Sequence, residues 1–463
     1  MEYNMRLLLS AALLLLSGSA SAESVLADIK VHETRLDNGM KVIVKEDHRA
    51  PIMVSQVWYK VGASYEPDGI TGISHVLEHM MFKGTQSHAP GEFSRIIAAN
   101  GGTENAFTGR DYTAYFQTMS SDRLAISLEL EADRMRNLAL PAEEFVKEVE
   151  VVKEERRLRT EDKPTGQTYE QFAALAYRSL PYANPVIGWM NDLDNMQVED
   201  LADWYRLWYA PNNATLVVVG DVVPEEVFRL ARQYFGPLKQ ESIPSLKPLR
   251  EPPQKGEIRS LVRIPANEPY LLMGYKTPVV TTAEKDWEPY ALEMLVAILD
   301  GGNSARFSKN LVRGSEVALS ASAEYNAFTR LPGMLMLDGT PAKGRSIAEL
   351  EGALREEIAR LRTDLVAEEE LDRVRTQVIA SKVFELDSVF YQAMEIGMLE
   401  TIGLDWRLLD QYVEKLKQVT PEQVRTVAQR YLQDDNLTVT QLDPQPMENG
   451  KQVRRSAGGR HGG

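Results

Sequence analysis

Extended segments near the start of the chain show the two-residue alternation of β-strands. Two such runs flank Asp37-Asn38-Gly39 in TRLDNGMKVIVK (34–45). An Asn-Gly turn between extended runs predicts a β-hairpin, because both residues accept a positive φ. The runs IMVSQVWY (52–59) and TAYFQTM (113–119) are rich in β-branched and aromatic residues, so we predict a strand for each.

Helical segments separate these strands. Apolar residues recur every three or four positions over 73–82, in GEFSRIIAAN after Pro90, over 122–137 and in the stretch that follows Pro141. This spacing is typical of amphipathic helices. We therefore expect helices and strands to be mixed along the whole chain.

The same succession of elements occurs twice. The segment VEDLADWYRLWYAPNNATLVVVG (198–220) predicts a helix, a polar turn and a β-branched strand, and PEQVRTVAQRYLQDDNLTVTQL (421–442) repeats that order at nearly the same spacing. Between them, GPLKQESIPSLKPLREPPQKG (236–256) carries five prolines. Proline at this density excludes helix interiors and central strands, so the stretch predicts a linker between two duplicated halves.

The ends of the chain differ from these halves. Arg6 precedes the apolar run LLLSAALLLL (7–16), and small residues lead to Ala22, where we predict cleavage of a secretory signal peptide. The run is about half the ~20 residues that span a bilayer, which argues against a membrane anchor. No later segment is apolar for long enough to cross a membrane, so we expect a periplasmic protein without stable membrane insertion.

These observations divide the chain into five parts. They are a signal peptide (1–22), an N-terminal domain (23–236), a linker (237–256), a C-terminal domain (257–446) and a polar, Gly-rich tail predicted to be disordered (447–463).

Composition narrows the possible chemistry. The chain has a net charge of -15, which disfavours nucleic acid as a partner. It contains no cysteine, so disulfides are excluded, and any bound metal must be held by His, Asp or Glu.

Two of the six histidines lie in GISHVLEHMMFKGT (72–85). On a helix, residues three and four apart share a face, so His75 and His79 can offer nitrogens to one ion while Glu78 lies beside it. The order His-x-x-Glu-His inverts the commoner zinc-helix motif but keeps all three roles within one turn. This pattern predicts a zinc hydrolase. On the residues alone, a polar helix face or a structural metal site stays open.

A catalytic zinc requires a third protein ligand. The helix AEEFVKEVEVVKEERRLRTED (142–162) offers Glu148 and Glu155, which lie almost in line seven positions apart. Phe145, Val151 and Val152 are expected close to the same face, where a carboxylate needs a positive partner. The alternative is an ordinary solvated acidic helix.

The quoted segments resemble the pitrilysin/insulinase family of zinc peptidases, which includes the mitochondrial processing peptidases. The resemblance covers nearly the whole mature chain. Its strongest parts are HVLEHMMFKGT (75–85), GGTENAFTGRDYTAYF (101–116), EVEVVKEE (148–155) and the stretch from PVIGWMNDL to NATLVVVGDV (185–222).

The resemblance implies one Zn²⁺ per chain, bound by His75 and His79 and by a glutamate about 75 residues further on, which selects Glu155. It implies that Glu78 is the catalytic base and that Glu148 is an outer glutamate that orients a ligand.

The resemblance also implies an α+β fold of two similar halves, each a largely antiparallel sheet packed with helices, which together enclose a chamber. A peptide substrate is expected to add as a strand along Asn105, Ala106 and Phe107. The implied activity is that of a zinc-dependent endopeptidase acting on peptides or unfolded segments.

One departure from the family concerns an Arg and a Tyr, seven apart, which assist the substrate or the transition state in single-chain members. The corresponding segment here is GGNSARFSKNLVRGSEVALSASAEY (301–325). An ungapped match places Val312 and Leu319 at the positions of the Arg and the Tyr. Shifting the match by one residue places Arg313 and Ser320 there, so the Tyr is still missing. We therefore predict the zinc-bearing subunit of a heterodimer whose homologous partner carries the Arg/Tyr pair.

Other assemblies and functions stay open at this stage. The chain could form a homodimer or act alone. It could also be a non-catalytic assembly or binding subunit, or a processing peptidase dedicated to one precursor peptide.

Overall fold

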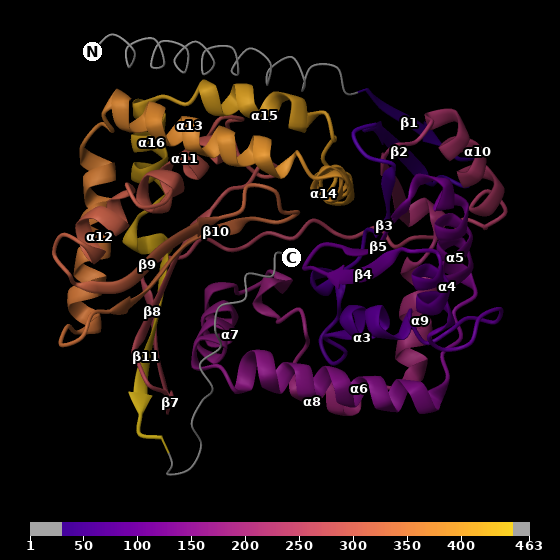
Figure 1. Cartoon of the computed structure of the whole chain (residues 1–463). Coiled ribbons are helices and arrows are strands. Elements are labelled where there is room, and N and C mark those ends of the chain that lie inside the picture. Colours follow the sequence, from indigo (N-terminus) through magenta and orange to yellow (C-terminus); the bar gives the residue numbers. More distant parts are fainter. Residues whose placement is uncertain (1–29, 448–463) are drawn as a thin grey trace, which may run out of the picture.

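The computed structural model describes residues 30–447. The predicted signal peptide and, apart from Met447, the predicted tail lie outside these residues. The described chain forms two β-sheets, each packed with helices (Figure 1). None of its helices is both long and apolar enough to span a membrane.

The first sheet has six strands and begins with the predicted hairpin. Its strands are β1 (Val31–Arg35), β2 (Lys41–Glu46), β3 (Ile52–Tyr59), β4 (Thr103–Thr108), β5 (Thr113–Ser120) and β6 (Ala214–Gly220), in the spatial order β1-β2-β6-β3-β5-β4. Gly39 takes the positive φ, 90°, in the turn between β1 and β2. Every residue of β6 is buried, as expected for a continuous apolar run in the middle of a sheet.

The second sheet repeats this plan. Its strands are β7 (Ile258–Pro265), β8 (Tyr270–Thr277), β9 (Ala318–Tyr325), β10 (Gly333–Pro341) and β11 (Leu437–Gln445), in the order β7-β11-β8-β10-β9. β11 is parallel to β7 and antiparallel to β8, as β6 is parallel to β2 and antiparallel to β3. The prediction of two similar α+β halves with largely antiparallel sheets is therefore confirmed.

Helices cover both sheets. Those of the first half are α3 (Ile73–Met80), α4 (Glu92–Ala99), α5 (Leu124–Arg136), α6 (Ala142–Arg156), α7 (Pro164–Ala176), α8 (Met190–Asn195), α9 (Val198–Trp208) and α10 (Pro224–Tyr234). Those of the second half are α11 (Glu288–Asp300), α12 (Ile347–Thr363), α13 (Glu368–Glu385), α14 (Val389–Thr401), α15 (Leu408–Lys417) and α16 (Pro421–Tyr431).

Each half lends one helix to the sheet of the other. α7 packs against β7, β8 and β11, whereas α14 packs against β3 and β6. Gly397 of α14 lies so close to Trp58 of β3 that a Cβ atom at this position would be 2.1 Å from the indole nitrogen. This exchange of helices fixes the two sheets relative to one another.

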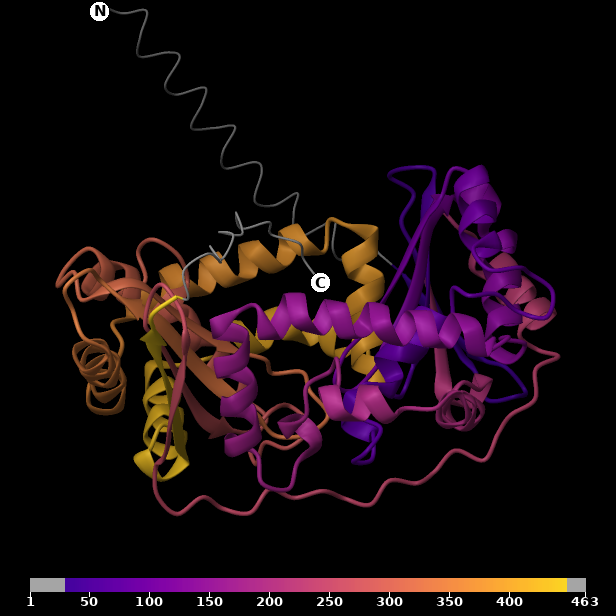
Figure 2. The ribbon, with the colours of Figure 1, turned by 90° about the horizontal axis from the view of Figure 1, so that it is seen from below.

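Polar contacts and an extended segment also join the halves. The Arg330 backbone N–H donates to Asp111 (3.0 Å), and its guanidinium donates to the Ser64 hydroxyl (2.7 Å). Between α10 and β7 the chain forms no helix or strand, and Figure 2 shows it running from one half to the other.

The buried face of α6 differs from the predicted one. Phe145 and Val152 are buried, but Val151 is 49% exposed. The apolar face is centred on Phe145 and Val152, so at 100° per residue Val151 lies about a third of a turn away from it. Glu148 and Glu155 lie along the margin of that face, and the inclusion of Val151 among the inward residues was wrong.

Candidate active site

Helix α3 is anchored on one side and capped at its start. Its apolar residues Ile73, Val76, Leu77 and Met80 are fully buried in the core of the first half. The buried carboxylate of Glu66 accepts hydrogen bonds from the backbone N–H groups of Gly72 (2.7 Å) and Ser74 (2.8 Å). A helix leaves these first N–H groups without partners, and a carboxylate also suits the positive end of the helix dipole. The opposite face of α3 is thereby held toward a pocket.

The face of α3 toward the pocket carries His75, Glu78 and His79, and α6 brings Glu155 to it. Glu155 Oε2 lies 3.6 Å from His75 Nε2 and 3.6 Å from His79 Nε2. One ligand atom from each of these three residues lies within 4.8 Å of the others, and this is the one such group of His, Asp or Glu among residues 30–447.

These donors fit a zinc ion. In a tetrahedral site with bonds of about 2.0–2.2 Å, the ligand atoms are separated by roughly 3.3–3.6 Å. Glu155 Oε2 is buried without a hydrogen-bond partner, and such an atom needs a positive partner. The other carboxyl oxygen of Glu155 is paired with Arg159 at 2.6 Å, which leaves Oε2 facing the histidines.

The charge states of two of the donors, His75 and Glu155, suit metal binding. Burial, together with the neighbouring His79, lowers the pKa of His75 to about 4, so this imidazole is neutral at pH 7 and keeps a free lone pair. The imidazole of His79 lowers the pKa of Glu155, as do His75 and Arg159, although burial acts in the opposite direction. The glutamate is therefore available as a carboxylate.

Glu148 orients His79 from behind. Its Oε2 lies 3.1 Å from His79 Nδ1, and its Oε1 is paired with Lys83 at 2.6 Å. A proton on Nδ1, donated to Glu148, leaves the Nε2 lone pair directed at Glu155 and the pocket. Burial lowers the pKa of His79, but the carboxylates of Glu155 and Glu148 outweigh this effect and raise it.

Glu78 lies in the same pocket but outside the group of three donors. Its Oε2 accepts a hydrogen bond from the Thr108 hydroxyl on β4. Burial raises the pKa of Glu78, while the bond from Thr108 acts against that rise. A carboxylate with a raised pKa is a stronger base than an exposed one, which is the property a general base requires.

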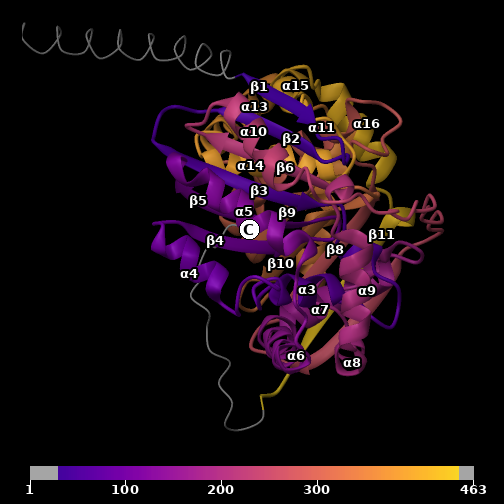
Figure 3. The same cartoon turned by 90° about the vertical axis from the view of Figure 1, so that its right-hand side faces the viewer.

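The pocket has a volume of about 820 Å³, and strand β4 forms one of its walls. Asn105, Ala106, Phe107 and Thr108 all line it. β4 is the last strand of its sheet and pairs with β5 alone among the described strands. Figure 3 shows the strands of the first sheet one beneath another, ending in β4 above α3 and α6. The predicted substrate residues thus lie on a sheet edge beside the metal donors.

Two further pocket residues were not found from the sequence. Arg110 Nη2 donates to the hydroxyl of Tyr169 on α7 at 2.8 Å, and the Arg110 guanidinium lies 5.2 Å from the ring centre of Tyr182. Within residues 30–447, Arg110 has no ion pair with a carboxylate. Arg110 belongs to the quoted stretch 101–116, whereas no motif marked Tyr169, because folding alone brings α7 to the pocket.

The second half offers no counterpart of the Arg/Tyr pair at the aligned positions. Val312 ends a short helical segment, Phe307–Val312, and Leu319 lies on β9 with 58% of its surface exposed. The pocket of the first half is lined by first-half residues.

Comparison with known protein families matches both halves of the chain. The family "Insulinase (Peptidase family M16)" matches residues 41–189, and the family "Peptidase M16 inactive domain" matches residues 195–378. The second name agrees with the absence of a metal-ligand group from the described part of the second half.

Individual relatives are zinc proteases. The chain is 37% identical to "Zinc protease PqqE" of Helicobacter pylori over 317 residues, which covers 67% of this chain and 70% of the relative. It is 24% identical to the uncharacterized zinc protease YmxG of Bacillus subtilis over 399 residues, covering 86% of this chain and 95% of that one.

Solved structures show the same fold. A protease from Helicobacter pylori superposes with a TM-score of 0.85 at 30% identity, covering 90% of this chain and 100% of that one. The periplasmic protease PqqL from Escherichia coli superposes with a TM-score of 0.76 at 17% identity, covering 90% of this chain and 48% of that one. At the lower identity the likeness concerns the fold alone. Together, these matches show that the chain belongs to the insulinase family of zinc proteases, the pitrilysin-type peptidases.

Proposed function

We propose that this chain is a zinc-dependent endopeptidase that cleaves peptides or unfolded segments. The observation that carries the proposal is the convergence of His75 Nε2, His79 Nε2 and Glu155 Oε2, with Glu155 Oε2 buried and without a hydrogen-bond partner. Three protein donors with one remaining position are the arrangement of a catalytic zinc site rather than a closed structural one.

In this proposal His75, His79 and Glu155 hold one zinc ion, and Glu148 fixes the ring of His79. A zinc ion held there supplies a Lewis acid that polarises a carbonyl group and lowers the pKa of water toward about 7. Glu78 accepts the proton that the attacking water loses as its oxygen bonds to the carbonyl carbon. Glu78 then gives that proton to the amide nitrogen as the C–N bond breaks.

The side chains around Glu78 support this role. Thr108 donates a hydrogen bond to one carboxyl oxygen and so holds the carboxylate in place. Burial strengthens Glu78 as a base, as its raised pKa indicates. A base whose proton affinity lies closer to that of the reacting groups transfers protons more effectively near neutral pH.

Substrate binding is assigned to the edge of β4 and to Arg110. An extended peptide that pairs with Asn105, Ala106 and Phe107 gains main-chain hydrogen bonds with little demand on its sequence. Arg110 has no carboxylate partner in the described chain, so its guanidinium is free to hold a peptide carbonyl or carboxylate group. Its bond to Tyr169 fixes the direction of the side chain.

We further propose that the chain is the zinc-bearing subunit of a periplasmic heterodimer. An ungapped match places Val312 and Leu319 at the positions of the family's Arg/Tyr pair, and a match shifted by one residue gives Arg313 but Ser320. A homologous partner would supply the missing side chains. The predicted signal peptide supports the periplasm, and PqqL, a structural neighbour, is described as a periplasmic protease.

The test is purification of the affinity-tagged chain from the periplasm, with hydrolysis of an unfolded protein measured before and after removal of any co-purifying chain. We expect bound zinc, inhibition by a chelator, recovery on addition of zinc, and loss of activity when the partner is removed. Brisk chelator-insensitive hydrolysis would contradict the zinc mechanism. Full activity of the isolated chain would contradict the proposed heterodimer but not the proposed zinc mechanism.

A further inference from the structure

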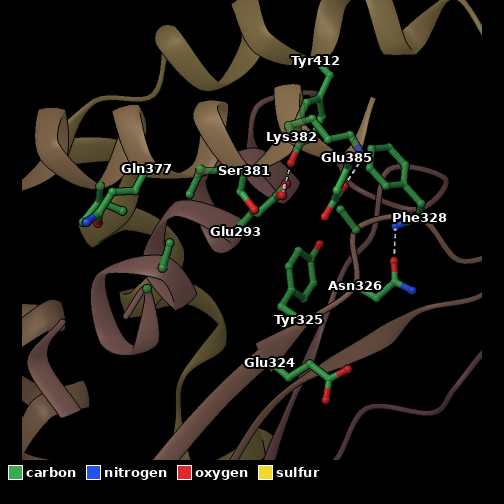
Figure 4. Close-up of a pocket in the computed structure, with 15 residues that line it drawn as sticks. Glu293, Glu324, Tyr325, Asn326, Phe328, Gln377, Ser381, Lys382, Glu385 and Tyr412 are labelled. Atoms are coloured by element: carbon green, nitrogen blue, oxygen red, sulfur yellow. Dashed lines mark hydrogen bonds and ion pairs between the residues drawn. The ribbon is translucent and has the colours of Figure 1, made fainter. Parts of the chain in front are cut away.

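The second half has its own pocket at the place that corresponds to the zinc pocket. It has a volume of about 570 Å³ and is lined by residues of α11, β9 and α13 (Figure 4). α11 follows β8 as α3 follows β3, and β9 ends the second sheet as β4 ends the first. α13 is the long helix beside it, as α6 is in the first half.

The two central helices share a glutamate but not the histidines. Tyr290-Ala291-Leu292-Glu293-Met294 on α11 aligns without a gap with His75-Val76-Leu77-Glu78-His79 on α3. Glu293 therefore takes the position of Glu78, while Tyr and Met replace the two histidines. The described chain places no group of metal donors in this second pocket, so a different ligand must be considered.

The pocket carries more negative than positive charge. Glu293, Glu324 and Glu385 line it, and Lys382 is the one lysine or arginine among its lining residues. That lysine is already engaged, since its Nζ lies 2.5 Å from Glu395 and 3.4 Å from Glu385. A further cation could enter without displacing a favourable pair.

Glu293 is the one of these three carboxyl groups with a buried oxygen that lacks a hydrogen-bond partner. One oxygen accepts a hydrogen bond from the Tyr412 hydroxyl, whereas Oε2 is buried and has no hydrogen-bond partner. Burial raises the pKa of Glu293 to about 7, because a carboxylate away from water needs a positive neighbour. Figure 4 shows its carboxyl group directed into the same space as the Tyr325 hydroxyl and the Glu385 carboxylate.

Aromatic rings complete a site for an organic cation with an apolar stem. Tyr325, Phe328 and Tyr412 line the pocket, and Lys382 Nζ already lies 5.4 Å from the ring centre of Tyr412. Aromatic faces attract ammonium and guanidinium groups, and rings also cover the methylene groups of long basic side chains.

The adjoining sheet edge favours a peptide over a free amine. Glu324 and Tyr325 lie on β9, the outermost strand of the second sheet, which pairs with β10 alone among the described strands. An extended peptide laid along such an edge gains main-chain hydrogen bonds and directs every second side chain to one face. We propose that this pocket binds the arginine or lysine side chain of a peptide.

The test is calorimetric titration of the full chain with Nα-acetyl-arginine amide, whose measurement does not depend on hydrolysis at the zinc pocket. Nα-acetyl-citrulline amide is the control ligand, because it keeps the shape but lacks the charge. We expect saturable binding of the arginine compound and weaker binding of citrulline by about tenfold or more, since hydrogen bonds to charged groups contribute ~1.5–3 kcal/mol.

Two variants are expected to change the affinity for the arginine compound in opposite directions. Glu293→Gln is expected to weaken arginine binding by about tenfold or more. Lys382→Gln removes the positive charge already present in the pocket and is expected to strengthen arginine binding. Glu369→Gln makes the same change of charge on an exposed side chain at the far end of α13 and should leave binding unchanged.

Several results would overturn the proposal. They are the absence of saturable binding, equal binding of arginine and citrulline compounds, or unchanged affinity in folded Glu293→Gln. If Glu293→Gln does not fold, Lys382→Gln provides the test. Unchanged or weaker binding of the arginine compound by Lys382→Gln would then overturn the proposal. Tighter binding of free spermidine than of the arginine compound would overturn the assignment to a peptide.

Discussion

The carboxylate of Glu148 holds the ring of His79, with 3.1 Å between Glu148 Oε2 and His79 Nδ1, while its second oxygen is paired with Lys83. The ring nitrogen that faces Glu155 is thereby fixed in direction before any metal arrives. In the proposed site Glu148 lies outside the three donors, so its contact with His79 would influence how tightly a zinc ion is bound.

Replacement of this glutamate tests that influence. Glu148→Gln is expected to weaken zinc affinity by about 10–100-fold, because the ring of His79 loses its charged acceptor. Competition with a chromophoric chelator measures the change. Glu154→Gln, an exposed side chain on the same helix, should bind zinc as the wild type does. Equal affinities for all three proteins would contradict the orienting role of Glu148.

Arg110 is expected to act on substrate binding more than on chemistry. Arg110→Gln should raise KM severalfold with a smaller effect on kcat, because the proposed contact of its guanidinium with the peptide is separate from the proton transfer at Glu78. Steady-state kinetics with a fluorogenic peptide give both constants. Arg123→Gln, which changes an exposed arginine, is the control. A loss confined to kcat would show that the assignment to substrate binding is wrong.

Glu66 links the stability of the first half to pH. Burial raises its pKa to about 7 from an ordinary value of 4.5. The folded state therefore binds this proton more tightly than the unfolded state, so the Glu66 contribution favours folding at low pH. This contribution to the free energy of unfolding falls by up to ~3 kcal/mol as the pH rises from about 4.5 to about 7. Above that range it changes little.

The measurement is the free energy of unfolding in urea at several pH values for wild type and Glu66→Gln. We expect the difference between the two proteins to change across this window, since other titrating groups are common to both. A constant difference from pH 4.5 to pH 7 would show that Glu66 does not have a raised pKa in the folded protein.

The packing of α14 on the first sheet depends on a glycine. Gly397→Ala would place a Cβ atom against the Trp58 indole, and such overpacking costs about 1–3 kcal/mol. Gly352 also lies within a helix, but a Cβ atom there would have no neighbour within 4 Å, so Gly352→Ala should stabilise by up to ~1 kcal/mol. Denaturant unfolding compares the two, and equal effects would contradict the close contact.

Local sequence patterns predicted much of the fold. The hairpin at Asn38-Gly39, helices α3 and α6, and the repeated helix and strand near 198–220 and 421–442 follow from turn chemistry and periodicity within short windows. The prediction that Val151 faces inward was wrong. Periodicity gives the spacing of residues along a helical face, but tertiary packing decides which face of the helix is buried.

The candidate site was only partly accessible from the sequence. His75, Glu78 and His79 share one helical turn, so their proximity is local. Glu155 was distinguished from the other glutamates of α6 by family resemblance, since an acidic helix offers several equivalent candidates. Arg110 and its partner on α7 were missed, because their contact depends on long-range packing rather than on any repeated pattern.

The most direct test of the central claim is to measure zinc content and peptide hydrolysis on the same preparation of Glu78→Gln, made from whichever form of the wild type is active, the isolated chain or the chain with its partner. We predict about one zinc per chain and a loss of hydrolysis of roughly 10²–10⁴-fold, since only the proton acceptor has been removed. Zinc-loaded Glu78→Gln that hydrolyses peptides at the wild-type rate would contradict the assignment of this pocket as the active site.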